Sequence, residues 1–150
     1  MRLQVASHQA KAITMRITIL GGAGGFFQAR NTEAAYPVQL ELLQQNVRGC
    51  DLAARYGGDE FTLVLPETPG RQASVGADRL RKMVEALPIH VVDKEGKSEH
   101  ITITISIGVA EYPYDANSAE MLVELADIAL YQAKHQGCNQ VVRYLGKPVS

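Results

Sequence analysis

The stretch Arg55-Tyr56-Gly57-Gly58-Asp59-Glu60-Phe61 places two glycines and two adjacent carboxylates between segments that have the composition of β-strands. Residues 51–56 are partly apolar, while residues 61–65 are rich in β-forming side chains and end at Pro66. Two such segments joined by a short glycine-containing turn predict a β-hairpin. Its tip would carry Asp59 and Glu60 in the open, because no lysine or arginine stands in the turn itself.

Adjacent carboxylates at a hairpin tip suit the binding of hard divalent cations. Mg²⁺ and Mn²⁺ take oxygen ligands and bridge them to substrate phosphates. Gly57 and Gly58 have no Cβ atoms, so a nucleotide could lie against their main chain. The alternative is an acidic turn that only keeps the protein soluble, since turns favour glycine and aspartate in any case. The residues of the turn alone leave both interpretations open.

The residues around this turn resemble those of a known family. Gly57–Phe61 is identified as the signature that names the GGDEF family, the diguanylate cyclases that condense two GTP into cyclic di-GMP. The flanks match as well, at Arg48–Asp51, Ser106–Ala110 and Ala126–Lys134. The likeness runs from about residue 43 to about residue 144. We therefore expect a GGDEF-like catalytic domain over residues 41–150 and an atypical segment, replaced or truncated relative to the family, over residues 1–40.

The expected fold is α+β, with a mostly antiparallel sheet and helices covering one or both of its faces. The resemblance implies the palm architecture of nucleotidyl cyclases and polymerases, with an atypical first-strand region. It also implies one GTP per domain, so that two domains must face each other as a homodimer for catalysis.

Roles for individual residues follow from the resemblance. Asp59 would be a metal ligand and the proton acceptor, with Glu60 as a further ligand for Mg²⁺ or Mn²⁺. Substrate binding would fall to Gly57 and Gly58, and Lys134 would contact the GTP phosphates. Taken without the family, Lys134 is an ordinary lysine near a helix C-terminus, where it offsets the helix dipole.

Arg48 and Asp51 stand at the spacing of the family's inhibitory site, which binds the product cyclic di-GMP. A guanidinium can fork onto phosphate or guanine acceptors, and a carboxylate can accept from guanine N–H groups. Arg79 falls where the family has a second arginine of that site. The alternatives are a surface ion pair of Arg48 with Asp51, worth little, and a solvated helix charge at Arg79.

The chain also departs from the family. No aspartate precedes Asp51, so the family's metal-binding aspartate on the first strand, its transition-state lysine and its guanine-reading residues have no counterpart. Cys138 stands where the family has a phosphate-binding arginine, and a thiol supplies neither the charge nor the fork. These departures predict weak GTP binding and slow or absent turnover. The rival interpretation is a non-catalytic module that binds cyclic di-GMP through Arg48 and Asp51 or docks a partner.

Residues 12–20 have the pattern of a strand, followed by the glycine-rich run Gly21–Gly25. A strand entering a glycine loop is typical of dinucleotide-binding turns. The full fingerprint needs a glycine where Phe27 stands, and there is no room for further βαβ units before the hairpin. A dinucleotide enzyme is therefore the remote alternative.

The other segments are predicted from periodicity and capping residues. Helices are expected over residues 38–46, over residues 70–87 with one apolar stripe, and from an Asn117 cap with Glu120 to a stop at Gly137. The stripe comprises Ala73, Ala77, Leu80, Val84 and Leu87, and the buried side of the last helix comprises Leu122, Leu125, Ala126, Ala129, Leu130 and Ala133. Strands are expected over residues 89–92, 101–109 and 141–144, with a polar turn over residues 93–99.

The composition argues against some classes of partner and location. The net charge of −1 over 150 residues argues against a nucleic-acid binder, which is normally basic. No apolar run reaches the ~18 residues of a membrane span, and no secretory signal is recognisable. Cys50 and Cys138 fit free thiols in a reducing compartment, which predicts a cytoplasmic location.

Overall fold

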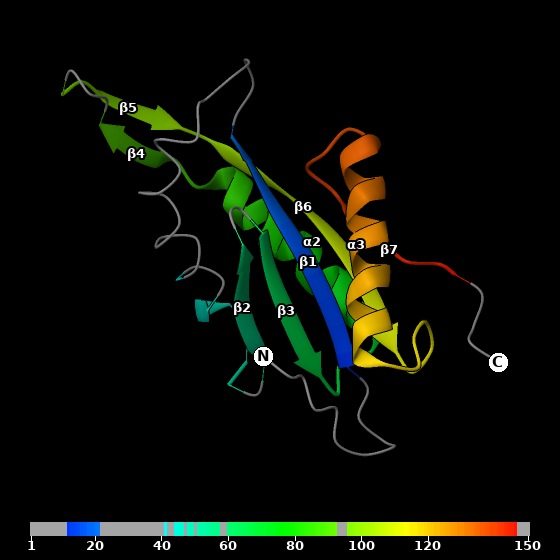
Figure 1. Ribbon diagram of the computed structural model, residues 1–150. Helices are drawn as coiled ribbons and strands as arrows, with labels where there is room; N and C mark the ends of the chain where they lie inside the picture. Colours follow the sequence, from blue (N-terminus) through cyan, green and yellow to red (C-terminus); the bar gives the residue numbers. More distant parts are fainter. Residues whose placement is uncertain are drawn as a thin grey trace.

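The computed structural model describes residues 12–21, 41, 44–46, 48–49, 51–57, 60–92 and 96–146. The described part is an α+β domain with two sheets and helices, which agrees with the expected fold class (Figure 1). In chain order its elements are β1 (Ala12–Gly21), β2 (Leu52–Gly57), β3 (Glu60–Pro66), α2 (Gly70–Ala86), β4 (Ile89–Val92), β5 (Ser98–Ile101), β6 (Ile103–Tyr112), α3 (Ala119–His135) and β7 (Val141–Arg143).

The main sheet has five strands in the order β2-β3-β1-β6-β7. All neighbours are antiparallel except β6 and β7, so the mostly antiparallel sheet is confirmed. The strand predicted over residues 12–20 is also confirmed, and as β1 it lies in the centre of the sheet between β3 and β6. The segment that the sequence analysis set apart as atypical thus supplies the central strand.

The antiparallel pairing of β1 on both sides bears on the dinucleotide alternative. A dinucleotide-binding βαβ unit needs parallel strands, whereas β1 runs antiparallel to both β3 and β6. Residues 22–25 and Phe27 lie outside the described residues. The pairing of β1 therefore gives this alternative no support.

The two long helices cover opposite faces of the sheet, as Figure 1 shows. The period of two along a strand explains this arrangement. On β3, Phe61 and Leu63 pack with α2, while Val64 packs with the cluster that contains α3. β6 is buried on both faces, because Ile107 packs with the α2 cluster and Ala110 with the α3 cluster.

The helical stripes agree with the sequence in most positions. On α2, Ala73, Ala77, Leu80 and Val84 are buried, whereas Leu87 is the half-buried C-cap. All six predicted core positions of α3 are buried, and Gly137 follows its C-cap with φ of 114°. The predicted Asn117 cap is wrong: the cap is Ser118, whose Oγ accepts from the Met121 N–H at 3.1 Å.

Several predicted boundaries need correction. The polar turn over residues 93–99 is too long, because Ser98 and Glu99 belong to β5, which pairs with β4. Ile101 also belongs to β5, and β6 begins at Ile103 and continues to Tyr112. The predicted last strand ends one residue early, at Arg143. Of the predicted helix 38–46, the structure describes residues 41 and 44–46. Residues 41, 44 and 45 are helical, and Asn46 is in a turn.

Gly108 on β6 is the point of closest approach between the sheet and α3. A Cβ at this position would overlap with main-chain atoms of Ala126 and Leu130. Backbone atoms inside a helix cannot rotate away as a side chain can. Gly108 is therefore required for α3 to lie flat on the sheet.

No helix in the part of the chain that the structure describes is long and apolar enough to cross a lipid bilayer.

We predict that Gly108→Ala lowers the free energy of unfolding by about 3 kcal/mol, at the upper end of ordinary overpacking. Gly76→Ala is the matched control, because a Cβ there meets nothing within 4 Å. That change should stabilise α2 by up to about 1 kcal/mol, since alanine is the better helix former. Urea unfolding of both variants measures the difference, and equal stability of the two would contradict the packing argument.

Candidate functional site

The predicted β-hairpin is present, formed by β2 and β3. Gly57 pairs with Glu60 and Arg55 with Phe61, with a register irregularity between them. Gly58 and Asp59 lie outside the described residues. Of the two adjacent carboxylates, the structure therefore describes Glu60. The Glu60 side chain is 34% exposed, so it is partly covered rather than fully in the open.

Lys134 is brought to the hairpin by α3. Its Nζ lies 4.0 Å from Glu60 Oε1, and both side chains are 34% exposed. An ion pair of this length and exposure contributes little to stability. Its importance is positional, because it sets an ammonium beside a carboxylate that the sequence had assigned to metal binding. The sequence analysis identified both residues as candidates for the site. It could not predict their contact, because they are far apart in the sequence.

The strand beside the hairpin carries no acidic side chain. Thr18 on β1 is the register partner of Glu60 on one side and of Ser106 on the other. No aspartate or glutamate occurs anywhere in Ala12–Gly21. At the level of Thr18, the carboxylate on a neighbouring strand is therefore Glu60 of the hairpin.

Cys138 closes the loop that follows α3. Its Sγ–H donates to the Lys134 carbonyl oxygen at 3.4 Å, and its main chain has φ of 61°. The thiol is free and partly buried. It therefore offers no positive charge at the position where the sequence analysis noted the absence of an arginine.

A second site lies between α2 and the segment before β2. Here a pocket of about 130 Å³ brings together Arg48, Asp51 and Arg79. Sequence reasoning had grouped the same residues, but it missed the apolar floor and rim supplied by Leu63, Leu65, Leu80 and Met83 and the polar Gln72. The spacing of an amphipathic helix indicates which side of α2 is buried, but not which exposed residues border a pocket.

The short contacts between Arg48 and Asp51 run through the backbone. Asp51 Oδ2 accepts from the Arg48 main-chain N–H at 2.7 Å, and the Asp51 N–H donates to the Arg48 carbonyl at 2.9 Å. This local turn orients the two residues toward one pocket.

Comparison with known proteins gives the family. The family model described as "Diguanylate cyclase, GGDEF domain" matches residues 39–140. The chain is 43% identical over 112 residues to diguanylate cyclase A of Treponema denticola, covering 72% of this chain and 29% of that protein. It is 36% identical to the response regulator PleD of Caulobacter vibrioides, covering 78% of this chain and 27% of that protein.

Solved structures agree on the fold. The GGDEF domain of YfiN (TpbB) from Pseudomonas aeruginosa matches with a TM-score of 0.74 and 26% identity, over 93% of this chain and 86% of that one. The GGDEF domain of DgcB from Caulobacter crescentus, in complex with c-di-GMP, matches with a TM-score of 0.69 and 20% identity, over 91% and 80% of the chains. The latter likeness concerns the fold alone.

Diguanylate cyclase A and PleD are longer than this chain, which spans less than a third of the length of either protein. The match nevertheless covers most of the chain and includes both the hairpin and the end of α3. The chain therefore belongs to the GGDEF-domain family of diguanylate cyclases.

Proposed function

We propose that this chain is a diguanylate cyclase domain that condenses two GTP into cyclic di-GMP and pyrophosphate. The observation that carries the proposal is the meeting of Lys134 and Glu60, with 4.0 Å between Nζ and Oε1, in a chain of this family. The Glu60 carboxylate would help to hold a divalent cation, and that cation and the Lys134 ammonium would together neutralise the charge of a triphosphate.

In each bond-forming step the 3′-hydroxyl oxygen of one GTP attacks the α-phosphorus of the other. The bond from that phosphorus to the bridging oxygen breaks, and pyrophosphate leaves. Asp59 accepts the hydroxyl proton, and Lys134 holds the charge of the leaving phosphates. Two such steps close the cyclic dinucleotide, and each needs a GTP held by a second copy of the domain. Positioning and charge neutralisation are the main contributions in phosphoryl-type transfer.

The donor set fits a magnesium ion. Among the described residues, no group of three or more His, Cys, Asp or Glu side chains could hold a metal. Mg²⁺ does not require such a group, because it binds through one or two carboxylates and completes its shell with water and substrate phosphates. Glu60, with Asp59 next to it in the sequence, matches that requirement. The cation would supply Lewis-acid polarisation of the α-phosphate.

Thr18 and Cys138 are the reason to expect slow turnover. At the sheet position beside Glu60 the chain has a threonine, and after α3 it has a thiol. Cys138 stands where the family has a phosphate-binding arginine, and no residue of β1 offers the carboxylate that the family's first strand supplies. The domain should therefore bind GTP weakly while keeping the geometry of the hairpin and of α3.

Binding of cyclic di-GMP is the second function, favoured by the pocket that Arg48, Asp51 and Arg79 share. Its volume of about 130 Å³ is below the ~300–1,000 Å³ of sites that enclose whole small molecules. It would therefore hold one guanine or phosphate, with the rest of the dinucleotide on the surface. This binding does not depend on β1 or Cys138, so it can persist where catalysis is slow.

We predict slow formation of cyclic di-GMP by the chain with Mg²⁺ and GTP. Cys138→Arg alone should not rescue it, because the position beside Glu60 still lacks a carboxylate. Thr18→Asp combined with Cys138→Arg should raise the rate by about tenfold or more, the size of effect expected from one added ligand and one added charge. Chromatographic product analysis measures the rates, with circular dichroism as the folding control. Fast turnover by the unmodified chain would overturn the assignment of Thr18 and Cys138 as deficient positions.

A further prediction concerns Asp59. In the Thr18→Asp, Cys138→Arg background, Asp59→Ala should abolish condensation and leave the melting temperature unchanged, because a turn residue contributes little packing. Loss of a metal ligand commonly costs several kcal/mol of barrier. If the activity survived this substitution, Asp59 would be neither a ligand nor the proton acceptor.

The pocket is tested by titration calorimetry with cyclic di-GMP. Arg48→Ala should weaken binding at least tenfold, about 1.4 kcal/mol, a modest demand on a charge-assisted contact. Arg71→Ala is the matched control, because Arg71 is an exposed arginine of the same helix α2 that does not line this pocket. Equal weakening by the two variants would indicate general electrostatic attraction instead of a site.

A further inference from the structure

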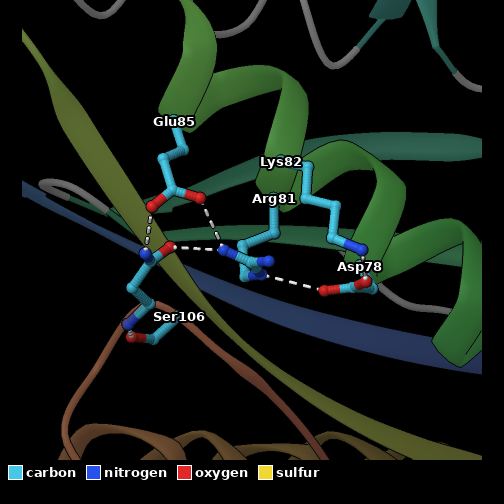
Figure 2. A network of polar contacts seen from close by, with 6 residues as sticks. Asp78, Arg81, Lys82, Glu85 and Ser106 are labelled. Carbon is cyan, nitrogen blue, oxygen red and sulfur yellow. Dashed lines mark hydrogen bonds and ion pairs between the residues drawn. The ribbon is translucent and has the colours of Figure 1, made fainter.

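Asn139, just after α3, is held by side chains of α2, the helix on the opposite face of the sheet. Its Nδ2 donates to Glu85 Oε1 at 2.8 Å, and its Oδ1 accepts from Arg81 Nη1 at 3.0 Å. Figure 2 shows Glu85 and Arg81 projecting from α2 toward the loop that follows α3, with Ser106 of β6 on the other side of that loop. Both ends of the Asn139 amide are therefore occupied by groups of α2.

Arg81 is the central member of this network. Only 13% of its side chain is exposed, and it contacts Asp78 and Glu85 at 2.9 Å each. The hydrogen bond that Arg81 donates to Asp78 is the main factor that raises the pKa of Arg81. The hydrogen bond from Asn139, followed by that from Arg81, lowers the pKa of Glu85. Asp78, Arg81 and Glu85 are thus all in their charged forms at neutral pH.

The same loop is fixed to the sheet and to α3. The Asn139 N–H donates to Ser106 Oγ at 3.1 Å, and Ser106 is completely buried. The Gln140 carbonyl accepts from the Ile107 N–H at 2.9 Å, and Gln140 Nε2 donates to the Ala133 carbonyl at 2.9 Å. β7 pairs with β6 only from Ile107 to Val109, so the edge of β6 is open to the loop at Ser106.

The backbone conformation of the loop requires such anchors. Cys138 and Asn139 have φ of 61° and 47°, two consecutive non-glycine residues in the left-handed region. This conformation is unfavourable for an ordinary residue, because its Cβ comes close to the following carbonyl oxygen, although asparagine tolerates it better. The contacts of Asn139 with α2 and with Ser106 compensate that cost and keep the turn closed.

We propose that Arg81 and Glu85 are positioning residues for the phosphate-binding end of α3. By holding Asn139 they fix the turn that begins directly after α3, and with it the place of Lys134 beside Glu60. Both residues act through Asn139 and not through a contact of their own with the nucleotide. The inference rests on the proposed function for Lys134, but the anchoring itself can be measured without any nucleotide.

Cys138 is a natural reporter of the turn. Its thiol is partly buried and bonded to the Lys134 carbonyl, so it should react slowly while the turn is closed. In a Cys50→Ser background, which leaves Cys138 as the single thiol, Arg81→Ala and Glu85→Ala should each raise its rate of alkylation by iodoacetamide about tenfold, because local opening becomes easier. Glu85→Gln keeps an acceptor for Asn139 and should stay near the parent rate.

Lys82→Ala is the matched control on α2. Lys82 is 65% exposed and bonds to Asp78 at 2.8 Å, without a contact to Asn139 among those described. The alkylation rate of this variant should equal that of the parent. Glu85 is itself 48% exposed, so its substitution tests the network even if Arg81→Ala impairs folding.

The second measurement is the affinity for GTP in the presence of Mg²⁺, with cyclic di-GMP as comparison. Arg81→Ala and Glu85→Ala should weaken GTP binding about as much as Lys134→Ala does, and should leave the affinity for cyclic di-GMP unchanged. An unchanged alkylation rate, or faster alkylation with unchanged GTP affinity, overturns the positioning role and leaves the proposed function intact. If the parent bound no GTP at all, the proposed function itself would fail, and the positioning of Lys134 for phosphate with it.

Discussion

The contact of α3 with β6 at Gly108 is the constraint on which the arrangement of the site depends. Because Gly108 has no side chain, the main chain of α3 at Ala126 and Leu130 approaches the sheet directly. Lys134 lies one turn beyond Leu130 on the same side of the helix. It therefore lies beside Glu60, which is paired across the sheet with Thr18, as Thr18 is with Ser106. A larger residue at position 108 would lift the helix and separate Lys134 from the hairpin.

The central strand shows that the sheet of this domain does not require an acidic residue beside Glu60. A central strand must pair on both edges, and β1 pairs with β3 on one side and with β6 on the other. This demand does not include a carboxylate. The hydrogen bonds between strands are made by the main chain and do not require a charged side chain. A strand with Thr18 opposite Glu60 therefore completes the sheet as well as a strand with an aspartate at that position. The pairing that stabilises the sheet and the supply of carboxylates beside Glu60 are therefore separate properties.

Helix α2 takes part in two polar assemblies on different sides. Arg79 borders the pocket shared with Arg48 and Asp51, and Arg81, two residues later, holds Asn139. The helix thereby connects the segment before the hairpin with the loop after α3, although these segments are far apart in the sequence. The buried stripe of α2 against β6 leaves its other faces free for both assemblies.

The sequence by itself determined the hairpin, the strand over residues 12–20, the apolar sides of both helices and the family, because these depend on local pattern: periods of two and 3.6, turn glycines and a short motif. It also identified Glu60, Lys134, Arg48, Asp51 and Arg79 as candidates. The Ser118 cap, the boundary of β5 and the burial of both faces of β6 were decided by tertiary contacts. So were the meeting of Lys134 with Glu60 and the bonds of Asn139 to α2, because they join residues distant in the chain through the register of the sheet and the depth at which α3 packs.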